Sequence, residues 1–241
     1  MRIALLGHGA MGRLVETCAR NQGREIGMIF TSKDSVLTLE EMSDRLRGHE
    51  VAIDFSVGNA VLKHATACGR AGVPLVEGTT GWKAEEAEVR RVVQSLHGGL
   101  ILGANFSIGI NLFYRVVAQA AELFGRVDEY DAFIEEAHHR RKRDAPSGTA
   151  LRLREIVATR SGRDLAVTST RAGYIPGTHR VGFDSAPDQI LLAHTARSRE
   201  GFASGALVAA QWVMGRRGVF EFSDVLDEIL SEVKRERRDM K

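Results

Sequence analysis

Cysteine is scarce in this chain, with only Cys18 and Cys68 among 241 residues. Because the two stand far apart and lack a paired-ligand spacing, they argue against a disulfide framework and a thiolate zinc site, and we expect a reducing compartment. Charge of one sign is also lacking: 33 lysines and arginines balance 31 acidic residues, which leaves a net charge of +2. Such a balance is unlike that of a dedicated nucleic-acid-binding protein.

Long hydrophobic runs are missing too. No apolar stretch approaches the roughly 18 residues that would cross a bilayer, and the chain starts with the short apolar run Ile3–Leu6 where a signal peptide would stand. We therefore expect a cytoplasmic protein with no membrane partner. Its 44% hydrophobic content is ample for the core of one large domain or two smaller ones.

Two kinds of catalytic pattern are absent. No serine stands in a Gly-x-Ser-x-Gly elbow, so covalent catalysis is not indicated. His138 and His139 could in principle join His179 or His194 around a metal, but no Glu-x-x-His or Cys-x-x-Cys spacing supports this. We predict that no metal is bound, and we interpret His194, which alternates with apolar residues, as structural.

Short apolar runs alternate with helical patterns over the first hundred residues. The expected strands are Ile3–Leu6, Ile26–Phe30, Val51–Phe55, Pro74–Glu77 and Leu100–Gly103. The expected helices between them are Met11–Asn21, Gly58–Gly72 and Lys83–Leu96. The strands are continuously apolar, as when helices cover both faces of a sheet, so the alternation predicts an α/β fold with a Rossmann-type doubly wound parallel sheet.

The pattern changes after Phe106. The remaining expected elements are a helix at Ile108–Phe124, a strand at Glu129–Ala137, a helix from Ser147, strands at Ala166–Arg171, Arg180–Asp184 and Ile190–Ala196, and helices at Gly201–Met214 and Val225–Val233, the last capped by Ser223. Strands that follow one another without helices predict a second α+β domain with an open mixed sheet. The predicted domains are residues 1–106, residues 107–200, and residues 201–241, which return to the first domain.

A glycine motif, Gly7-His8-Gly9-Ala10-Met11-Gly12, links the first strand to the first helix. Gly7 permits the tight turn, Gly9 lets the backbone approach a pyrophosphate, and Gly12 allows close packing of helix and strand. The motif stands in the strand-to-helix context that it requires, so it predicts a dinucleotide site formed by these six residues.

The second strand is followed by Thr31-Ser32-Lys33, at the place where an acidic residue usually holds the ribose. Two hydroxyls and an ammonium suit a 2′-phosphate, although Asp34 follows directly. We therefore predict that NADP(H) is preferred or at least accepted.

Two small-residue loops follow later strands. They are Gly78-Thr79-Thr80-Gly81 after the fourth strand and Gly103-Ala104-Asn105-Phe106 after the fifth. Ligands bind at the carboxyl ends of strands in open α/β sheets, so these loops can position a nicotinamide ring. The alternative interpretation is that both are ordinary turns.

The tract from Glu135 to Ala150, EEAHHRRKRDAPSGTA, combines proton-transfer groups with fixed cations. Ser147 can cap the helix that follows, which leaves the amides of Gly148 and Thr149 facing outward at the positive end of the helix dipole. Histidine and lysine beside such an end suit a small dianionic substrate that is protonated during the reaction. The basic run alone would favour a solvated loop or a nucleic-acid patch, and the glycine motif tips the interpretation towards an enzyme.

With these residues assembled, the chain resembles the dihydrodipicolinate reductases over nearly its whole length. The resemblance rests on Gly7–Gly12, Glu77-Gly78-Thr79-Thr80-Gly81, Ala104-Asn105-Phe106-Ser107-Ile108-Gly109 and, above all, His138-His139-x-x-Lys142-x-Asp144-Ala145-Pro146-Ser147-Gly148-Thr149-Ala150. It implies that NADPH or NADH reduces a cyclic imine made from pyruvate and aspartate semialdehyde, 4-hydroxy-tetrahydrodipicolinate, on the diaminopimelate route to lysine.

The resemblance also implies roles for the matching residues. His138 would be the catalytic acid/base and Lys142 a proton donor, while the dicarboxylate substrate would be bound by His139, Ser147, Gly148 and Thr149. The cofactor would be held by Gly7 to Gly12, Gly78 to Thr80 and Gly103 to Phe106. Family members are typically homotetramers, although the segment between Gly162 and Arg171 is shorter here than the family pattern.

Two other functions stay open from the sequence. One is a different imine or amino-acid dehydrogenase, such as an aspartate dehydrogenase, which would not need the arrangement from Lys142 to Thr149. The other is an NADP(H)-sensing regulator that binds nucleic acid through Arg140 to Arg143.

Overall fold

The computed structural model describes residues 1–239, which form two compact units. One unit contains residues 1–108 together with the chain from residue 199 onward, and the other contains residues 109–198. The functional division after residues 106 and 200 stays a prediction. Within the described part of the chain, no helix is both long and apolar enough to cross a membrane.

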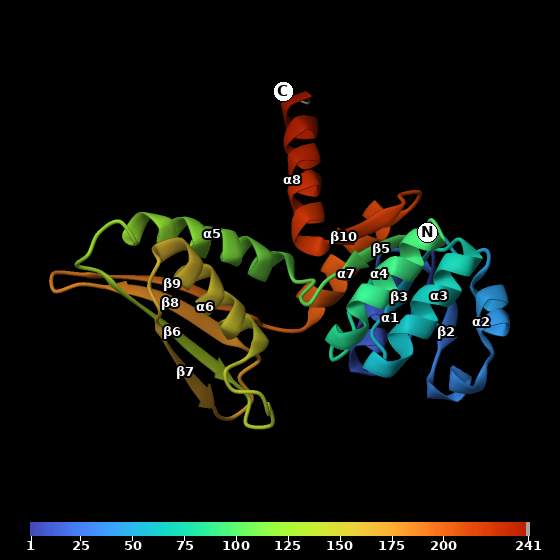
Figure 1. The fold of residues 1–241 in the computed structure, drawn as a ribbon, viewed down its shortest axis with the longest axis horizontal. Helices are drawn as coiled ribbons and strands as arrows, with labels where there is room; N and C mark the ends of the chain where they lie inside the picture. The colour runs from blue at the N-terminus through green and yellow to red at the C-terminus, as the bar shows by residue number, and fades with distance from the viewer. Residues whose placement is uncertain (240–241) are drawn as a thin grey trace. The chain divides into compact units, whose positions relative to one another are not determined.

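A six-stranded parallel sheet forms the centre of the first unit (Figure 1), with the strand order β10-β5-β4-β3-β1-β2. Its strands are β1 (Arg2–Leu6), β2 (Glu25–Phe30), β3 (Val51–Asp54), β4 (Leu75–Glu77), β5 (Gly99–Leu102) and β10 (Gly218–Glu221). Because all the strands run the same way, the loops that follow β1 to β5 lie along one edge of the sheet. Ligands bind at this edge in folds of this class.

Helices cover both faces of this sheet. They are α1 (Ala10–Asn21), α2 (Leu39–Leu46), α3 (Val61–Ala71), α4 (Glu86–Ser95), α7 (Glu200–Val213) and α8 (Phe222–Asp239), with short 3-10 turns η1 (Ser32–Val36), η2 (Gly58–Ala60) and η3 (Lys83–Glu85). Alternate residues of β1 enter opposite cores: Ile3 and Leu5 pack with residues of α1 and α7, whereas Ala4 and Leu6 pack with residues of α2, α3 and α4. This two-sided burial explains why the strands are continuously apolar.

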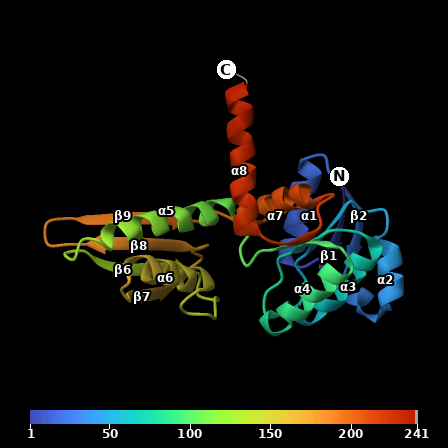
Figure 2. The ribbon, with the colours of Figure 1, turned by 45° about the horizontal axis from the view of Figure 1, so that its top comes forward.

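The second unit places two helices on one face of a four-stranded mixed sheet (Figure 2). Its elements are α5 (Ile108–Phe124), β6 (Asp131–His138), α6 (Gly148–Ser161), β7 (Ala166–Arg171), β8 (Thr178–Asp184) and β9 (Gln189–Thr195). The strand order is β7-β6-β8-β9; β6 pairs with β7 in parallel, and the other two pairs are antiparallel. Ile134, Val181 and Phe183 pack beneath α5 and α6, so polar residues further along the same strand faces are buried as well.

The predicted fold class is confirmed, since a Rossmann-type parallel sheet is joined to a second unit with a mixed sheet. One local prediction is wrong, and two elements were not predicted. The sequence reasoning missed β10 and α2, although the capping box between Thr38 and Glu41 marks the start of α2. Ser223 does not cap the last helix, because α8 already begins at Phe222.

Candidate active site

The predicted glycine loop lies between β1 and the start of α1. Gly7 has a φ of +90°, and a Cβ there would lie 2.7 Å from the Cα of Ser56, so a larger residue does not fit. A Cβ at Gly12 would lie 2.1 Å from the carbonyl oxygen of Gly7. At Gly9, by contrast, a Cβ would meet nothing within 4 Å. The first turn of α1 therefore faces open space, which suits a pyrophosphate at a helix N-terminus.

The other loop residues leave this space free. The Nε2 atom of His8 lies 2.7 Å from Oε2 of Glu16, so its ring is tied to the side of α1. Ala10 is exposed and Met11 is half-buried. A contact between these three residues and a dinucleotide stays a prediction.

The loop after β2 uses its acidic residue internally. The Asp34 carboxylate accepts hydrogen bonds from the backbone amide and the hydroxyl of Thr31, at 2.8 and 3.1 Å, and lies 3.5 Å from the Arg45 guanidinium. Ser32 and Lys33 are exposed beside it. Asp34 is therefore occupied in a capping box rather than placed as a ribose ligand, and the exposed hydroxyl and ammonium stay compatible with a phosphate.

Two buried carboxyl groups support the loop after β4. Asp54 and Glu77 are paired across β3 and β4 and are almost fully buried. Glu77 accepts a hydrogen bond from the Thr79 amide at 2.7 Å, and Asp54 accepts one from the Thr79 hydroxyl at 3.2 Å and contacts Nδ1 of His64 at 2.6 Å. Burial and the nearby Asp54 carboxylate raise the pKa of Glu77 well above its usual value. Both carboxyl groups hold the predicted nicotinamide loop through Thr79. The sequence reasoning named Glu77 only as part of a motif and did not name Asp54.

Phe106 has a structural position in the loop after β5. Its ring is 1% exposed and packs against Phe55 and Phe222, with ring centroids 6.2 and 4.8 Å apart. The preceding residue, Asn105, folds back so that its side-chain oxygen accepts a hydrogen bond from the Ser107 amide at 2.9 Å. Only backbone groups of Phe106 are therefore left for the predicted cofactor contact, while Gly103 and Ala104 stay partly open.

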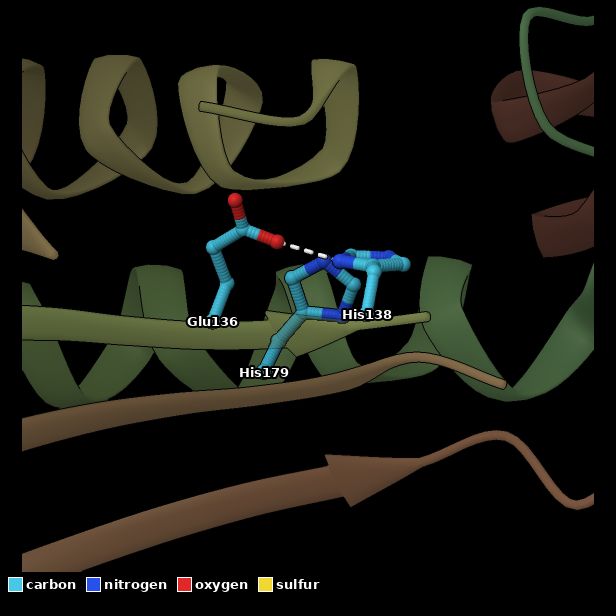
Figure 3. Close-up of side chains that lie close together, drawn as sticks. All are labelled: Glu136, His138 and His179. Carbon is cyan, nitrogen blue, oxygen red and sulfur yellow. Dashed lines mark hydrogen bonds and ion pairs between the residues drawn. The ribbon is translucent and has the colours of Figure 1, made fainter. Parts of the chain in front are cut away.

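Glu136, His138 and His179 form a buried polar cluster in the second unit (Figure 3). Glu136 and His138 lie two residues apart on β6, so their side chains point to the same face of the sheet. Antiparallel pairing places His179 of β8 opposite Glu136, and parallel pairing places Arg171 of β7 beside His138. The sheet register thus gathers residues that are up to 43 positions apart (136 to 179).

The Glu136 carboxylate is the centre of the cluster. One oxygen, Oε2, is hydrogen-bonded to Nδ1 of His138, and the other, Oε1, accepts hydrogen bonds from Nη2 of Arg171 at 2.6 Å and from the Ser147 amide at 3.2 Å. Burial raises the pKa of Glu136, but the hydrogen bonds from Arg171 and Ser169 outweigh this effect and lower the pKa to about 2. The group is therefore ionised at neutral pH.

Ser147 caps α6 as predicted and also contacts a histidine. Its hydroxyl oxygen accepts a hydrogen bond from the Ala150 amide at 3.2 Å and lies 3.1 Å from Nε2 of His179. Burial, together with the nearby His138 ring, lowers the pKa of His179 to about 4. His179 is thus a neutral hydrogen-bonding group next to the cap. The Ser147 hydroxyl has its partners within the cluster, and its predicted contact with the substrate stays a prediction.

The basic tract lies between β6 and α6. Nζ of Lys142 forms an ion pair with Asp144 at 2.8 Å, and the Lys142 backbone amide donates to the His139 carbonyl at 3.0 Å. Beyond the Ser147 cap, Gly148 is exposed and Thr149 is half-buried, so the first turn of α6 is partly open. Burial lowers the pKa of His138, the Glu136 charge opposes this, and the nearby Lys142 and Arg171 charges add to it. The Lys142 charge therefore acts on His138, and proton transfer from Lys142 stays a prediction.

The three side chains of the cluster also resemble a set of metal ligands. One ligand atom from each of Glu136, His138 and His179 lies within 4.8 Å of the others. Arg171 is bonded to the same carboxylate at 2.6 Å, and its fixed charge would repel a cation there. The absence of a metal stays a prediction, and the hydrogen-bonding arrangement supports it.

His179 gives the second unit an expected acid sensitivity. Its pKa falls from 6.5 to about 4 on folding, so the unfolded chain takes up a proton at a higher pH than the folded one. The free energy of unfolding should therefore decrease as the pH falls, by about 3 kcal/mol between about pH 7 and pH 4. We expect His179→Gln, which keeps a neutral hydrogen-bonding group, to show a smaller decrease in urea titrations at each pH.

The control is His97→Asn at an exposed position. Because the His97 ring is solvated in both states, the free energy of unfolding of this variant should depend on pH as in the wild type. If His179→Gln lost as much stability on acidification as the wild type, the buried ring would not be the cause.

The two units together define a class of protein. A glycine loop on a parallel sheet and a buried acid–base cluster on a separate mixed sheet are the parts of a nicotinamide-dependent oxidoreductase. Residues 1–106 match the family model for the dihydrodipicolinate reductase N-terminus, and residues 109–226 match the model for its C-terminus. The chain belongs to the dihydrodipicolinate reductase family.

Curated relatives and a solved structure agree with this assignment. The chain is 34% identical over 241 residues to the 4-hydroxy-tetrahydrodipicolinate reductase of Christiangramia forsetii, covering 95% of this chain and 99% of the relative. It is 38% identical over 230 residues to the enzyme of the same name from Anaeromyxobacter dehalogenans, covering 85% and 83% of the two chains. The fold is similar to that of a dipicolinate-bound dihydrodipicolinate reductase from Paenisporosarcina sp. TG-14, with a TM-score of 0.76, 22% identity and coverage of 92% and 97%.

Membership of this family confirms that the chain is an NAD(P)H-dependent oxidoreductase and does not favour the alternatives, a different amino-acid dehydrogenase and a nucleic-acid-binding sensor. The assignments of individual site residues stay predictions. The structure brings His138 and Ser147 together through Glu136, and the Lys142 charge acts on His138. Sequence reasoning missed Glu136 and Arg171 and did not place His179 in the site. The Glu-x-His spacing on a predicted strand was the available signal for the first of these.

Proposed function

We propose that this chain reduces 4-hydroxy-tetrahydrodipicolinate to tetrahydrodipicolinate in the diaminopimelate route to lysine. The observation that carries the proposal is the Glu136–His138 pair joined to the capped start of α6, in a chain that belongs to the dihydrodipicolinate reductase family. The first unit holds a reduced nicotinamide dinucleotide, which supplies the hydride when bound. The second unit holds the dicarboxylate substrate and supplies the protons.

The cofactor fits the residues present. Gly7 and Gly12 could not carry a Cβ without a clash, whereas the space at Gly9 is open for a pyrophosphate at the start of α1. The loops Gly78–Thr80 and Gly103–Phe106 lie at the same carboxyl edge of the sheet and would line the nicotinamide through small side chains and backbone groups.

The substrate carries two carboxylates, which call for donors that stay in place. The amides of Gly148 and Thr149 at the open start of α6 and the ring of His139 would bind them. Loss of the ring hydroxyl as water first leaves an unsaturated imine. Hydride addition to this imine pushes electrons towards the ring nitrogen, which takes up a proton, so a cation and a proton source nearby lower the barrier. Lys142 would donate the proton and His138 would act as the acid/base.

A coupled assay tests the proposal directly. The product of dihydrodipicolinate synthase, made from pyruvate and aspartate semialdehyde, is supplied with NADPH or NADH, and the loss of reduced-nicotinamide absorbance is followed. We expect turnover that depends on both enzymes. Absence of turnover with either cofactor, in a folded sample that binds NADPH, would show that the substrate is a different one.

We further propose that NADPH is the preferred cofactor and that the 2′-phosphate lies against Ser32 and Lys33. Lys33→Ala should raise the KM for NADPH about tenfold, the size of one lost hydrogen bond to a charged group, and should change the KM for NADH little. Lys83→Ala, which removes an exposed lysine outside this loop, is the control. Equal changes in both KM values, or no change in either, would count against a 2′-phosphate contact.

The proposal also covers the oligomeric state of the chain and its place in the cell. We expect a cytoplasmic homo-oligomer, a tetramer as in related proteins. Every second residue of β9 points away from the helices. One of these residues is the apolar Leu191, which is 47% exposed and would be covered by a second subunit. Sedimentation analysis of the purified protein would give the number of subunits.

A further inference from the structure

The Glu136 carboxylate joins three segments of the second unit. It lies on β6, and it bonds to His138 of the same strand, to Arg171 at the end of β7 and to the backbone amide of Ser147 at the start of α6. Glu136 itself is 2% exposed. A buried, ionised carboxylate that accepts hydrogen bonds from all three segments is costly to misplace, so these segments are held in one arrangement.

The partners of Glu136 determine the proton position on His138. A guanidinium and a backbone amide are donors at every pH at which the protein is folded, and both are bonded to Oε1. Oε1 is therefore an acceptor, and because Glu136 is ionised at neutral pH, Oε2 faces Nδ1 of His138 as an acceptor too. If Nδ1 carried no proton, two acceptors would face each other. The neutral ring must therefore carry its proton on Nδ1, and Nε2 is left free.

The free nitrogen faces a position that has no side chain. A Cβ at Gly177, between β7 and β8, would lie 3.0 Å from Nε2 of His138 and 3.2 Å from its Cδ2. Glycine at this position leaves Nε2 uncovered from that side, and an alanine would press on it. The ring nitrogen that Glu136 does not bind is thus the one that faces a residue without a side chain.

We propose that Glu136 is the positioning residue of this site. It fixes His138 as the Nδ1–H tautomer with Nε2 as the atom that exchanges a proton, and it ties that ring to the turn Ser147–Thr149. Its effect on turnover rests on the proposed function, because the turn is where the substrate carboxylates would bind. The tautomer and the ring orientation belong to the free protein and do not depend on the substrate.

Charged and titratable groups on several elements act on the His138 ring. They are Glu136 on β6, Lys142 in the following loop, Arg171 on β7 and His179 on β8. Glu136 contributes the negative charge among them, and it favours the protonated ring against the two cations. Replacing its charge by a neutral amide should therefore move the titration of His138 to lower pH.

The first test needs no variant. Nitrogen-15 spectra of the histidine side chains in the wild-type protein, without substrate, should show neutral His138 protonated on Nδ1. An Nε2–H tautomer would overturn the proposal whatever the enzyme turns over.

The second test compares Glu136→Gln with Glu135→Gln. Glu135 is the neighbouring carboxylate on the opposite face of β6, where it is half exposed and lies 3.5 Å from Arg180. We expect Glu136→Gln to lower kcat about 100-fold, as for a misplaced acid/base. The titration of His138 and the matching limb of the pH–rate profile should both move to lower pH. The variant should also populate the Nε2–H tautomer. Glu135→Gln should match the wild type, and Glu136→Asp should recover part of kcat.

The outcomes separate this proposal from the proposed function. A wild-type protein that binds NADPH but does not reduce the substrate refutes the function, and the tautomer measurement still decides the role of Glu136. An active wild type with an unchanged kcat in Glu136→Gln overturns the positioning role. A lower kcat with an unchanged tautomer and titration also overturns it, because the loss would then come from folding; urea titration of both variants identifies that case.

Discussion

Replacing Lys142 with alanine should lower kcat by about 10²- to 10⁴-fold, the usual contribution of a positioned proton donor. The reason is that the Lys142 ammonium is one of the charges that act on the buried His138 ring, and Asp144 holds it at 2.8 Å with its side chain 25% exposed. The measurement is the steady-state rate in the coupled assay. The unfolding midpoint should stay close to that of the wild type, because the lost ion pair is at the surface.

Two further variants distinguish a proton donor from a fixed charge. Lys142→Arg keeps the cation but gives up its proton only above about pH 12, so it should be nearly as slow as Lys142→Ala if the proton is what matters. Full recovery of kcat in Lys142→Arg would instead assign Lys142 a purely electrostatic role. Arg143→Ala removes an exposed cation from the same loop and should leave kcat unchanged. Loss of activity in that control would mean that the net charge of the tract is responsible.

The parallel sheet could be predicted from the sequence because β1 to β5 each form a short apolar run. β1 is buried on both faces and therefore appears as an unbroken apolar run, and the alternation with helices determines that the strands are parallel. β10 carries no such signal. Its four residues, Gly218–Glu221, join the sheet by pairing with β5, more than a hundred positions earlier, and a four-residue strand stabilised by that remote pairing has no recognisable pattern of its own.

The residues of the active site also include some that local sequence signals predict and others that they do not. Ser147, Gly148 and Thr149 were predicted because a helix cap is a local feature, and the cap is confirmed for Ser147. Arg171 and His179 reach the cluster only through the register of β6 with β7 and β8, which local spacing does not reveal. Arg171 in particular neutralises Glu136 from 35 positions away (136 to 171). The sequence reasoning therefore found the side chains proposed for chemistry and missed those that hold them.

Phe106 lies in a predicted ligand loop but has its side chain in the core, and its predicted contact with the cofactor stays a prediction. Gly103 leaves room for its ring, because a Cβ there would lie 2.6 Å from the ring, and a Cβ at Gly205 of α7 would lie 1.7 Å from the Phe106 carbonyl oxygen. Both glycines therefore leave room for Phe106. The ring thus joins the loop after β5 to Phe222 at the start of α8.

Phe106→Ala should therefore lower the free energy of unfolding of the first unit by about 3–5 kcal/mol, as for other buried aromatic side chains that leave a cavity. The chain offers a selective probe, since its two tryptophans, Trp82 and Trp212, are both buried in this unit. Urea titration followed by tryptophan fluorescence should show the loss, while Val36→Ala, at a site 85% exposed, should change stability by no more than about 0.5 kcal/mol. Under native conditions the dissociation constant for NADPH should change little. Unchanged stability combined with much weaker NADPH binding would contradict the core assignment and would identify the ring as a direct cofactor contact.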